Sequence, residues 1–241
     1  MDNRGKIAIV FYGLTRSLRK TYPSIKANIF DVLTQAGYSY TTYMHTYQID
    51  GTYTNSWAKE HCSNYDNTQH TVLQPDHLLF DNQASCLETL SIESYYTKLG
   101  NWTNLSPEMT RFLIRNLALG LYSKKRITDY LVSTGIQYDY VIIMRPDYTI
   151  LRPLCMNWFS ELGPDSIIIP ERDWFHGCND RMCIAKPSVA FYYGTLFTEL
   201  LDYSRSTSII SERFCLDMLK KRNLTIIGKP IDYTMTRAEN N

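Results

Sequence analysis

The sequence predicts an α/β fold, a single domain in which a mixed, mostly parallel β-sheet is covered by helices on both faces. Strand-like and helix-like periods of apolar residues alternate along the chain, which is typical of this class. The run 138–144 is almost continuously apolar, as expected for a central strand buried on both faces. The 241 residues, 44% hydrophobic and 20% charged, suit one large globular domain over 1–241.

The first half of the chain begins with a predicted strand over 6–11, and Gly13 follows in a turn. Leucine and isoleucine recur at helical spacing over 17–36, which predicts a helix that Gly37 ends. A second strand is expected over 39–44. From about 47 to 105 the periodicity is lost, and we expect an irregular functional insertion there.

The second half returns to regular patterns. Ser106 followed by proline marks the start of an amphipathic helix over 109–134. After the central strand at 138–144, a further buried strand is expected over 166–169. The remaining segments are predicted as two helices and a short last strand, over 187–203, 210–222 and 224–227.

Ligands in open α/β sheets bind beyond the carboxyl ends of the strands, so the residues after each strand are the candidates for a site. The turn after the first strand offers backbone amides and arginines to an anion. The alternative is that Arg16 and Arg19 are solvated residues of the first helical turn. The chain has neither a Gly-x-Gly-x-x-Gly fingerprint nor a phosphate-binding loop. The residues of this turn are Tyr12, Gly13, Leu14, Thr15 and Arg16.

The central strand is followed by Arg145, Pro146 and Asp147. A carboxylate at this position is placed to hold a divalent metal ion or to accept a hydrogen bond from a sugar hydroxyl. The alternative interpretation is an Arg145–Asp147 pair that only closes the end of the strand.

The segment 170–181, after the strand at 166–169, is the densest polar cluster in the chain. It combines carboxylates, a histidine, an amide and arginines with aromatic rings, which suits a catalytic base, hydroxyl contacts and a stacking face. A solvated charged loop is the alternative. His45, at the end of the second strand, is a weaker candidate because a single histidine is more often structural. The cluster's candidates are Asp173, Trp174, His176, Asn179, Asp180 and Arg181.

Four segments in this order resemble the motifs of small GT-A-type nucleotide-sugar glycosyltransferases: 7–16, the strand that ends near His45, 138–147 and 177–185. Among these enzymes, the chain is most similar to those of capsule-polysaccharide clusters and large DNA viruses. The resemblance covers most of the chain to about residue 203 and fades through 50–105. It implies a Rossmann-like GT-A fold and a hexosyl- or pentosyltransferase.

The resemblance implies transfer of a sugar from a UDP- or GDP-sugar to a glycan hydroxyl, with Mn²⁺ or Mg²⁺ on the diphosphate. Asp147 stands where the family has its metal-binding Asp-x-Asp, and Asp180 becomes the candidate general base for inverting transfer. Position 145 is arginine where the family has an acidic residue, so Arg145 is an alternative to the metal as the group that neutralises the diphosphate. The implied donor-binding residues are Tyr12, Gly13, Leu14, Thr15, Arg16, His45, Arg145 and Asp147.

The charge and the composition of the chain limit the kinds of partner and location that we expect for it. With 25 basic and 24 acidic residues, the chain has a formal charge of +1, which favours no nucleic-acid partner. The sequence shows neither a signal-peptide pattern at its start nor an apolar stretch long enough to span a bilayer, so we expect a cytoplasmic protein. The alternative function is a non-catalytic module of the same fold that binds carbohydrate or nucleotide-sugar. A phosphotransferase is disfavoured because the chain has no phosphate-binding loop.

Overall fold

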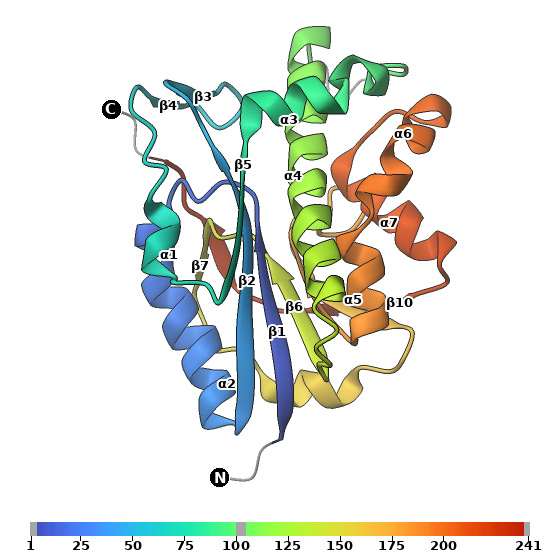
Figure 1. The fold of residues 1–241 in the computed structure, drawn as a ribbon. Coiled ribbons are helices and arrows are strands. Elements are labelled where there is room, and N and C mark those ends of the chain that lie inside the picture. Colours follow the sequence, from blue (N-terminus) through green and yellow to red (C-terminus); the bar gives the residue numbers. More distant parts are fainter. Residues whose placement is uncertain (1–3, 100–104, 239–241) are drawn as a thin grey trace.

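In a computed structural model that describes residues 4–99 and 105–238, the chain forms a seven-stranded sheet with helices on both faces (Figure 1). The strand order is β10-β8-β9-β6-β1-β2-β5. Strand β9 runs antiparallel to both of its neighbours, and the other neighbouring pairs are parallel. The predicted fold class, a mixed and mostly parallel sheet, is confirmed.

The elements have the following bounds. The sheet contains β1 (Gly5–Tyr12), β2 (Tyr38–Gln48), β5 (His77–Asn82), β6 (Tyr140–Met144), β8 (Ser166–Pro170), β9 (Met182–Ala185) and β10 (Thr225–Lys229). Two antiparallel pairs lie outside it: β3 (Tyr53–Asn55) with β4 (Glu60–Cys62), and β7 (Tyr148–Ile150) with β11 (Tyr233–Met235). The helices are α1 (Leu18–Ile25), α2 (Asp31–Gln35), α3 (Gln83–Leu90), α4 (Pro107–Ser133), α5 (Pro187–Gly194), α6 (Phe197–Ser206) and α7 (Ser211–Lys221).

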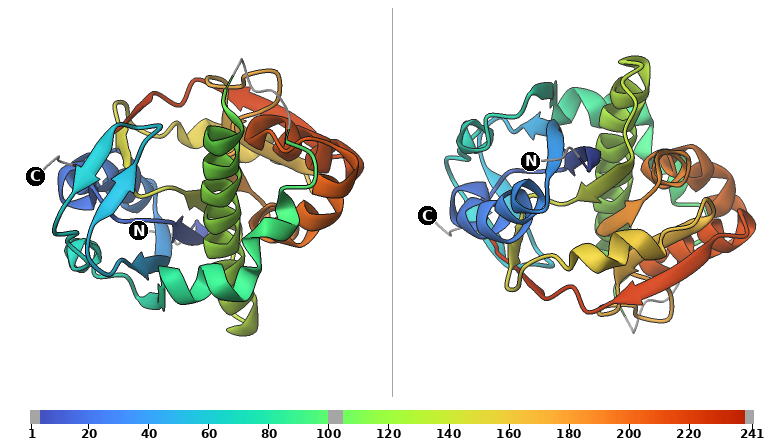
Figure 2. Two further views of the ribbon diagram at one scale, coloured as in Figure 1. Left: turned by 90° about the horizontal axis from the view of Figure 1, so that it is seen from above. Right: turned by 90° about the horizontal axis from the view of Figure 1, so that it is seen from below.

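Strand β1 shows why the central strands are apolar without alternation. One side of it (Ile7, Ile9, Phe11) packs into the core that includes α1, and the other (Ala8, Val10, Tyr12) packs into the core beneath α4 to α7. Both sides are therefore buried, as is usual for parallel sheets between helices. Figure 2 shows α5 to α7 on the opposite side of the molecule from α1 and α2.

Two predicted helices are interrupted. The predicted helix over 17–36 is helical from 18 to 35 but contains a π turn over Lys26–Phe30 between α1 and α2, after Pro23 within α1. The segment 187–203 is divided into α5 and α6 near Gly194. A Cβ atom at Gly194 would lie 2.2 Å from Thr128 Oγ1 on α4, so this glycine permits the close contact between α5 and α4.

The segment 47–105 is more regular than expected. Its strand β5 joins the sheet as an edge strand beside β2, and Asn82 caps α3 by accepting a hydrogen bond from Ser85 N at 3.1 Å. The segment also contains the β3–β4 hairpin. Residues of β5 are half-buried or exposed, so this strand lacks the apolar pattern that identifies central strands. Across the described part of the chain, no helix has both the length and the apolar character that crossing a membrane requires.

Candidate active site

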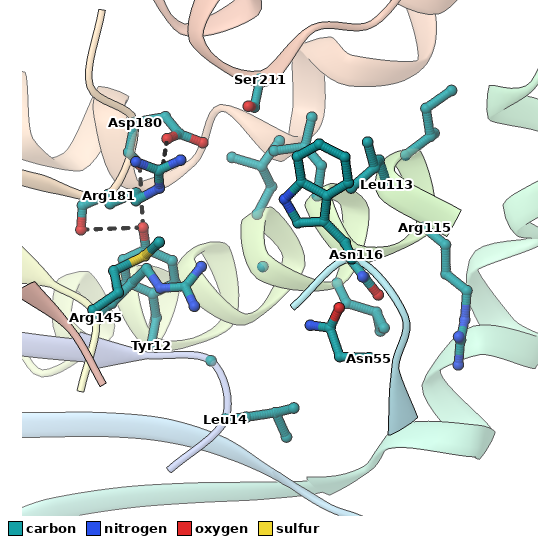
Figure 3. A pocket seen from close by; sticks show the side chains of 18 of the residues that line it. Tyr12, Leu14, Asn55, Leu113, Arg115, Asn116, Arg145, Asp180, Arg181 and Ser211 are labelled. Carbon is teal, nitrogen blue, oxygen red and sulfur yellow. Dashed lines mark hydrogen bonds and ion pairs between the residues drawn. The ribbon is translucent and has the colours of Figure 1, made fainter. Parts of the chain in front are cut away.

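A cavity of about 840 Å³ opens at the carboxyl ends of β1, β2 and β6. Its walls come from the turn after β1, the first half of α4, the β3–β4 hairpin, the β8–β9 loop, the start of α7 and the chain after β11. In Figure 3, Arg145, Asp180 and Arg181 gather at one end, and Leu113 and Asn116 of α4 lie at the other. The two ends therefore differ in chemistry: one is charged, and the other is lined mainly by apolar and amide side chains, with Arg115 beside them (Figure 3).

Arg16 connects three segments at the charged end. It follows β1 and is buried, and its guanidinium donates to Glu60 Oε2 on β4 and to Asp147 Oδ2 after β6, both at 2.8 Å. It also donates to the hydroxyl of Tyr53 on β3. Arg19, by contrast, is about half exposed and pairs with Asp66 on the surface. The solvated interpretation thus describes Arg19 but not Arg16.

Asp147 is the centre of this ion-pair network. Its side chain is 1% exposed, and Oδ1 accepts a hydrogen bond from Arg145 Nε at 2.9 Å. Oδ2 accepts from Arg145 Nη2 at 2.5 Å and from Arg16 Nη2 at 2.8 Å. Burial acts to raise the pKa of the Asp147 carboxyl, but the two guanidiniums hold it well below its ordinary value. Asp147 is therefore a paired carboxylate in the wall behind the cavity.

The surroundings of Asp147 do not fit the divalent ion that the family resemblance implies. Both of its oxygens are engaged by guanidinium groups, whose positive charges oppose a second cation at this place. Within the described ranges, no group of three or more histidine, cysteine, aspartate or glutamate side chains is arranged to hold a metal ion. The residues present are instead suited to an anion.

Five arginines line the cavity: Arg115 on α4, and Arg16, Arg145, Arg181 and Arg237. Arg237 follows β11, and its guanidinium makes no hydrogen bond or ion pair with any described residue. Partial burial lowers the pKa of Arg237, and the positive charge of Arg16 lowers it further. A guanidinium that has no partner in the described part of the chain and lies near others of the same charge makes this end of the cavity favourable for an anion.

Asp180 also lies at the charged end of the cavity, but it precedes its strand instead of following it. Because β9 is antiparallel to β6, the start of β9 lies beside the carboxyl end of β6, so Asp180 arrives just before its strand. The Tyr12 hydroxyl of β1 donates to the backbone carbonyls of Asp180 and Arg181, at 3.1 and 3.3 Å. The Asp180 side chain is 14% exposed, and Arg181 Nε lies 3.6 Å from its Oδ1. The carboxylate is thus fixed at the cavity wall.

The loop before Asp180 has a strained backbone. Asp173, Phe175 and His176 all have positive φ angles, of 58°, 37° and 68°. All three line the cavity, and the Phe175 side chain is 59% exposed. Residues held in this conformation are uncommon outside glycine and collect at binding sites.

Glu212 is a cavity residue that the sequence analysis missed. It lies in the first turn of α7, accepts a hydrogen bond from Arg181 Nη2 at 3.1 Å and another from Ser211 Oγ at 2.7 Å. Burial raises the pKa of the Glu212 carboxyl, and the nearby Asp180 raises it further. The sequence marks Glu212 only as an acidic residue in the first turn of a predicted helix. Such residues are common in helices without any functional role, so the sequence could not identify Glu212 as a site residue.

The predicted site residues divide into two sets. Nine of them line the cavity: Tyr12, Gly13, Leu14, Arg16, Arg145, Asp173, His176, Asp180 and Arg181. The other five lie outside the lining and support it from behind or beside it: Thr15, His45, Asp147, Trp174 and Asn179.

Three of the supporting residues have clear structural partners. His45 is buried, its Nδ1 lies 2.7 Å from Ser123 Oγ, and that hydroxyl in turn accepts a hydrogen bond from Gly13 N at 2.7 Å. Burial lowers the pKa of His45. Trp174 Nε1 donates to Pro170 O at 2.6 Å. Asn179 Oδ1 accepts from the backbone of Arg181 at 3.0 Å.

No protein-family model and no curated protein sequence matches this chain. Several solved structures are similar to it over most of its length. The galactosyltransferase LgtC, in complex with donor and acceptor sugar analogs, aligns over 89% of this chain and 70% of its own, with 10% identity and a TM-score of 0.44. Mouse xyloside xylosyltransferase 1 aligns over 93% of this chain and 84% of its own, with 9% identity and a TM-score of 0.41.

The glycosyltransferase GlyE of Streptococcus pneumoniae TIGR4 aligns over 92% of this chain and 45% of its own, with 13% identity and a TM-score of 0.43. All three structures are of glycosyltransferases. Similarity of this extent is not evidence for an activity.

Proposed function

We propose that the protein transfers a glycosyl group from a UDP- or GDP-sugar to a hydroxyl group of a glycan acceptor. The observation that carries the proposal is the charged end of the cavity. There Arg237, which has no hydrogen-bond or ion-pair partner among the described residues, and further guanidiniums face the same space as the Asp180 carboxylate. A diphosphate leaving group and a hydroxyl nucleophile need these two kinds of group side by side.

The arginines take the diphosphate. Arg237 has its full hydrogen-bonding capacity available within the described chain, and Arg145 and Arg181 line the same end. Guanidinium groups bind phosphate oxygens in a two-point geometry, and they neutralise the charge that develops as the diphosphate leaves. In this proposal they do the work that a divalent ion does in metal-dependent transferases.

The other end of the cavity takes the nucleoside. It presents the indole of Trp57, which is 48% exposed, and the side chains of Leu113 and Asn116. An aromatic ring supplies a stacking face, and amides supply both donors and acceptors to a base edge. Gly13 lies between the two ends with a φ of 92°, a conformation that favours glycine, and no atom would contact a Cβ there. The chain after β1 is thus open to close approach by a ribose.

Asp180 acts as the general base in this proposal, with inversion at the sugar. The acceptor oxygen attacks the anomeric carbon, its proton passes to the Asp180 carboxylate, and the bond from the anomeric carbon to the diphosphate oxygen breaks with its electron pair on the diphosphate. The nearby cavity residues Asp173, His176 and Ser211 are placed to contact the acceptor hydroxyls.

The test is a panel of UDP-, GDP- and CMP-sugars, measured by calorimetry for binding and by product release for turnover, with Mn²⁺ and with a chelator. We expect one nucleotide class to bind, and binding and turnover to persist in the chelator. Asp180→Asn should lower kcat by at least about a hundredfold, whereas Asp202→Asn, an exposed aspartate on α6, should not.

Other outcomes decide against the proposal. If no nucleotide-sugar binds, the proposal fails. Binding without turnover on a panel of glycan acceptors supports the non-catalytic binding module. If turnover requires a divalent ion, the arginines do not replace the metal.

A further inference from the structure

The long helix α4 contains one glycine, Gly120, near the middle of its 27 residues. In the interior of a helix, glycine is the least favourable residue after proline, because its backbone loses the most conformational freedom on folding. The backbone at this position does not call for glycine, since Gly120 has no positive φ angle of the kind found at Gly13. The missing side chain therefore needs another explanation.

Close packing does not explain this glycine either. Among the described residues, leaving aside the adjoining turns of α4 itself, no atom would lie within 4 Å of a Cβ at Gly120. Gly194 is the opposite case, because a Cβ there would lie 2.2 Å from Thr128 Oγ1. Gly120 is instead half-buried and lines the cavity of about 840 Å³. The open space beside it is therefore part of the cavity.

Gly120 lies midway between the two ends of the cavity. Asn116, one turn earlier on α4, lies at the apolar end (Figure 3), whereas the hydroxyl of Ser123 accepts a hydrogen bond from Gly13 N at 2.7 Å in the turn after β1. A rise of 1.5 Å per residue places Gly120 about 6 Å beyond Asn116 and about 4.5 Å before Ser123. Residues three apart share one face of a helix, so Gly120 lies on the same side of α4 as Ser123.

Gly13 and Gly120 thus adjoin each other in the middle of the cavity wall. At Gly13, too, no described atom would lie within 4 Å of a Cβ. Both positions expose backbone where a side chain would otherwise project, and backbone without a Cβ permits close approach of a ligand. In a nucleoside diphosphate the ribose joins the base to the diphosphate, so a ligand that spans both ends of the cavity has its ribose at this place.

We propose that Gly120 is a specificity-determining residue for the donor, and that Gly120 and Gly13 form a subsite in which the ribose packs against the backbone. This inference rests on the proposed function, which places the base at one end of the cavity and the diphosphate at the other. It explains why a destabilising residue occurs in the middle of α4, because a side chain at position 120 would occupy the space of the ring.

The test compares Gly120→Ala with the wild type in stability and in binding. Alanine is the best helix former, and its Cβ would contact no described atom outside α4, so the melting temperature should rise by roughly 2–4 °C. The affinity for UDP or GDP, measured by calorimetry, should fall at least about tenfold, because the methyl group overlaps the ribose. Gly120→Leu should weaken binding further. Weaker binding together with higher stability is a result that a merely structural role would not produce.

A second ligand and a second variant serve as matched controls. Pyrophosphate occupies only the charged end of the cavity, so its affinity should be the same for Gly120→Ala and for the wild type. Val132→Ala changes a residue of the same helix that is 49% exposed and lies outside the cavity lining. It should alter the affinity for neither ligand.

Three results would overturn the subsite. The first is equal affinity of Gly120→Ala and the wild type for the nucleoside diphosphate. The second is an equal loss of affinity for pyrophosphate, because the substitution would then disturb the whole cavity. The third is a lower melting temperature, because the packing of the folded protein would then require the glycine.

The failure of this inference can be told apart from the failure of the proposed function. If the wild type binds neither UDP, GDP nor their sugars, the proposed function fails and the ribose subsite fails with it. If the wild type binds one of them and Gly120→Ala binds it equally well, only the subsite fails.

Discussion

Arg145 and Asp147, two residues apart across Pro146, form a two-point ion pair, with Arg145 Nε 2.9 Å from Asp147 Oδ1 and Nη2 2.5 Å from Oδ2. The pair lies at the carboxyl end of β6, and Arg16 closes it from the end of β1. Position 145, where the resemblance described above implies an acidic residue, thus carries the partner of Asp147. The charge available to a ligand at this edge of the sheet is therefore positive.

Removal of the Asp147 charge should destabilise the protein strongly. Asp147→Asn leaves Arg16 and Arg145 buried without their shared carboxylate, and we expect the free energy of unfolding to fall by about 3–5 kcal/mol. Urea unfolding at pH 7 measures this change. Asp66→Asn, which breaks the surface pair with Arg19, is the control, and its cost should stay below about 1 kcal/mol.

The stability of the wild-type protein at acidic pH should also depend on the ion pairs of Asp147. The pKa of Asp147 is held below the ordinary value of 3.8, so the folded protein binds this proton less readily than the unfolded chain. The stability that Asp147 contributes is therefore present above about pH 4 and is lost as the pH falls below it. Asp147→Asn should lack this part of the acid dependence, and an unchanged slope below pH 4 would contradict the assignment.

Arg237 should affect ligand binding without affecting stability. Since its guanidinium has no partner within the described residues, Arg237→Gln removes no hydrogen bond or ion pair of that part of the folded protein. We expect the affinity for UDP or GDP, measured by calorimetry, to fall roughly 10- to 100-fold, as for the loss of a charge-assisted hydrogen bond. Arg152→Gln, at an exposed arginine that pairs with Asp232, should leave the affinity unchanged. Equal affinities for the Arg237 variant and the wild type would remove Arg237 from the anion site.

Gly177 should not tolerate a side chain. A Cβ atom there would lie 2.0 Å from the backbone carbon of Glu212 and 2.1 Å from its oxygen. Gly177→Ala must push the β8–β9 loop away from α7 and break the hydrogen bond from Cys178 N to Glu212 O, now 3.0 Å long. We expect a lower melting temperature together with weaker turnover. Gly163→Ala is the control, because the nearest atom to its Cβ is Ser166 Oγ at 3.8 Å.

His45 should make stability depend on pH in a different range. Burial lowers its pKa from the ordinary 6.5, against the opposing effect of Asp81, so the unfolded chain binds this proton more readily than the folded protein. Stability is therefore lost as the pH falls below about 6.5. His45→Gln should flatten the dependence of the melting temperature between about pH 5 and 6.5. A variant curve parallel to that of the wild type would show that His45 is not the group responsible.

The sequence predicted those parts of the site that follow directly from a buried strand. Tyr12 and Arg145 adjoin apolar runs that are unmistakable in the sequence, and a strand end fixes where its neighbours lie. Asp180 was a candidate as part of the polar segment after the strand at 166–169, but the strand that positions it, β9, was not predicted. The partners from distant segments could not be predicted. Arg16 meets Glu60 across 44 positions, and Arg181 meets Glu212 across 31. Local periodicity contains no information about which loop folds over which strand end.

Lys124, a fully buried residue of α4, shows the same limit within a helix that the sequence did predict. In the amphipathic pattern of α4, a lysine between apolar positions is expected to face solvent. The close approach of α5, which Gly194 allows against Thr128, covers that side of the helix instead. The burial of Lys124 therefore depends on a packing contact with a helix 60–70 positions away in the chain.

Because β9 runs antiparallel to its neighbours, the position of the Asp180 carboxylate and the shape of the cavity wall beside it depend on different segments of the chain. Asp180 lies just before the first residue of a strand that is hydrogen-bonded to β6 and β8, whereas the loop residues 171–176, farther before it, are exposed or half-buried. Residues inserted or deleted in that loop would remodel one wall of the cavity without displacing the carboxylate. Under the proposed function, acceptor preference can therefore diversify, in evolution or by loop grafting, while the carboxylate proposed as the base stays where the sheet fixes it.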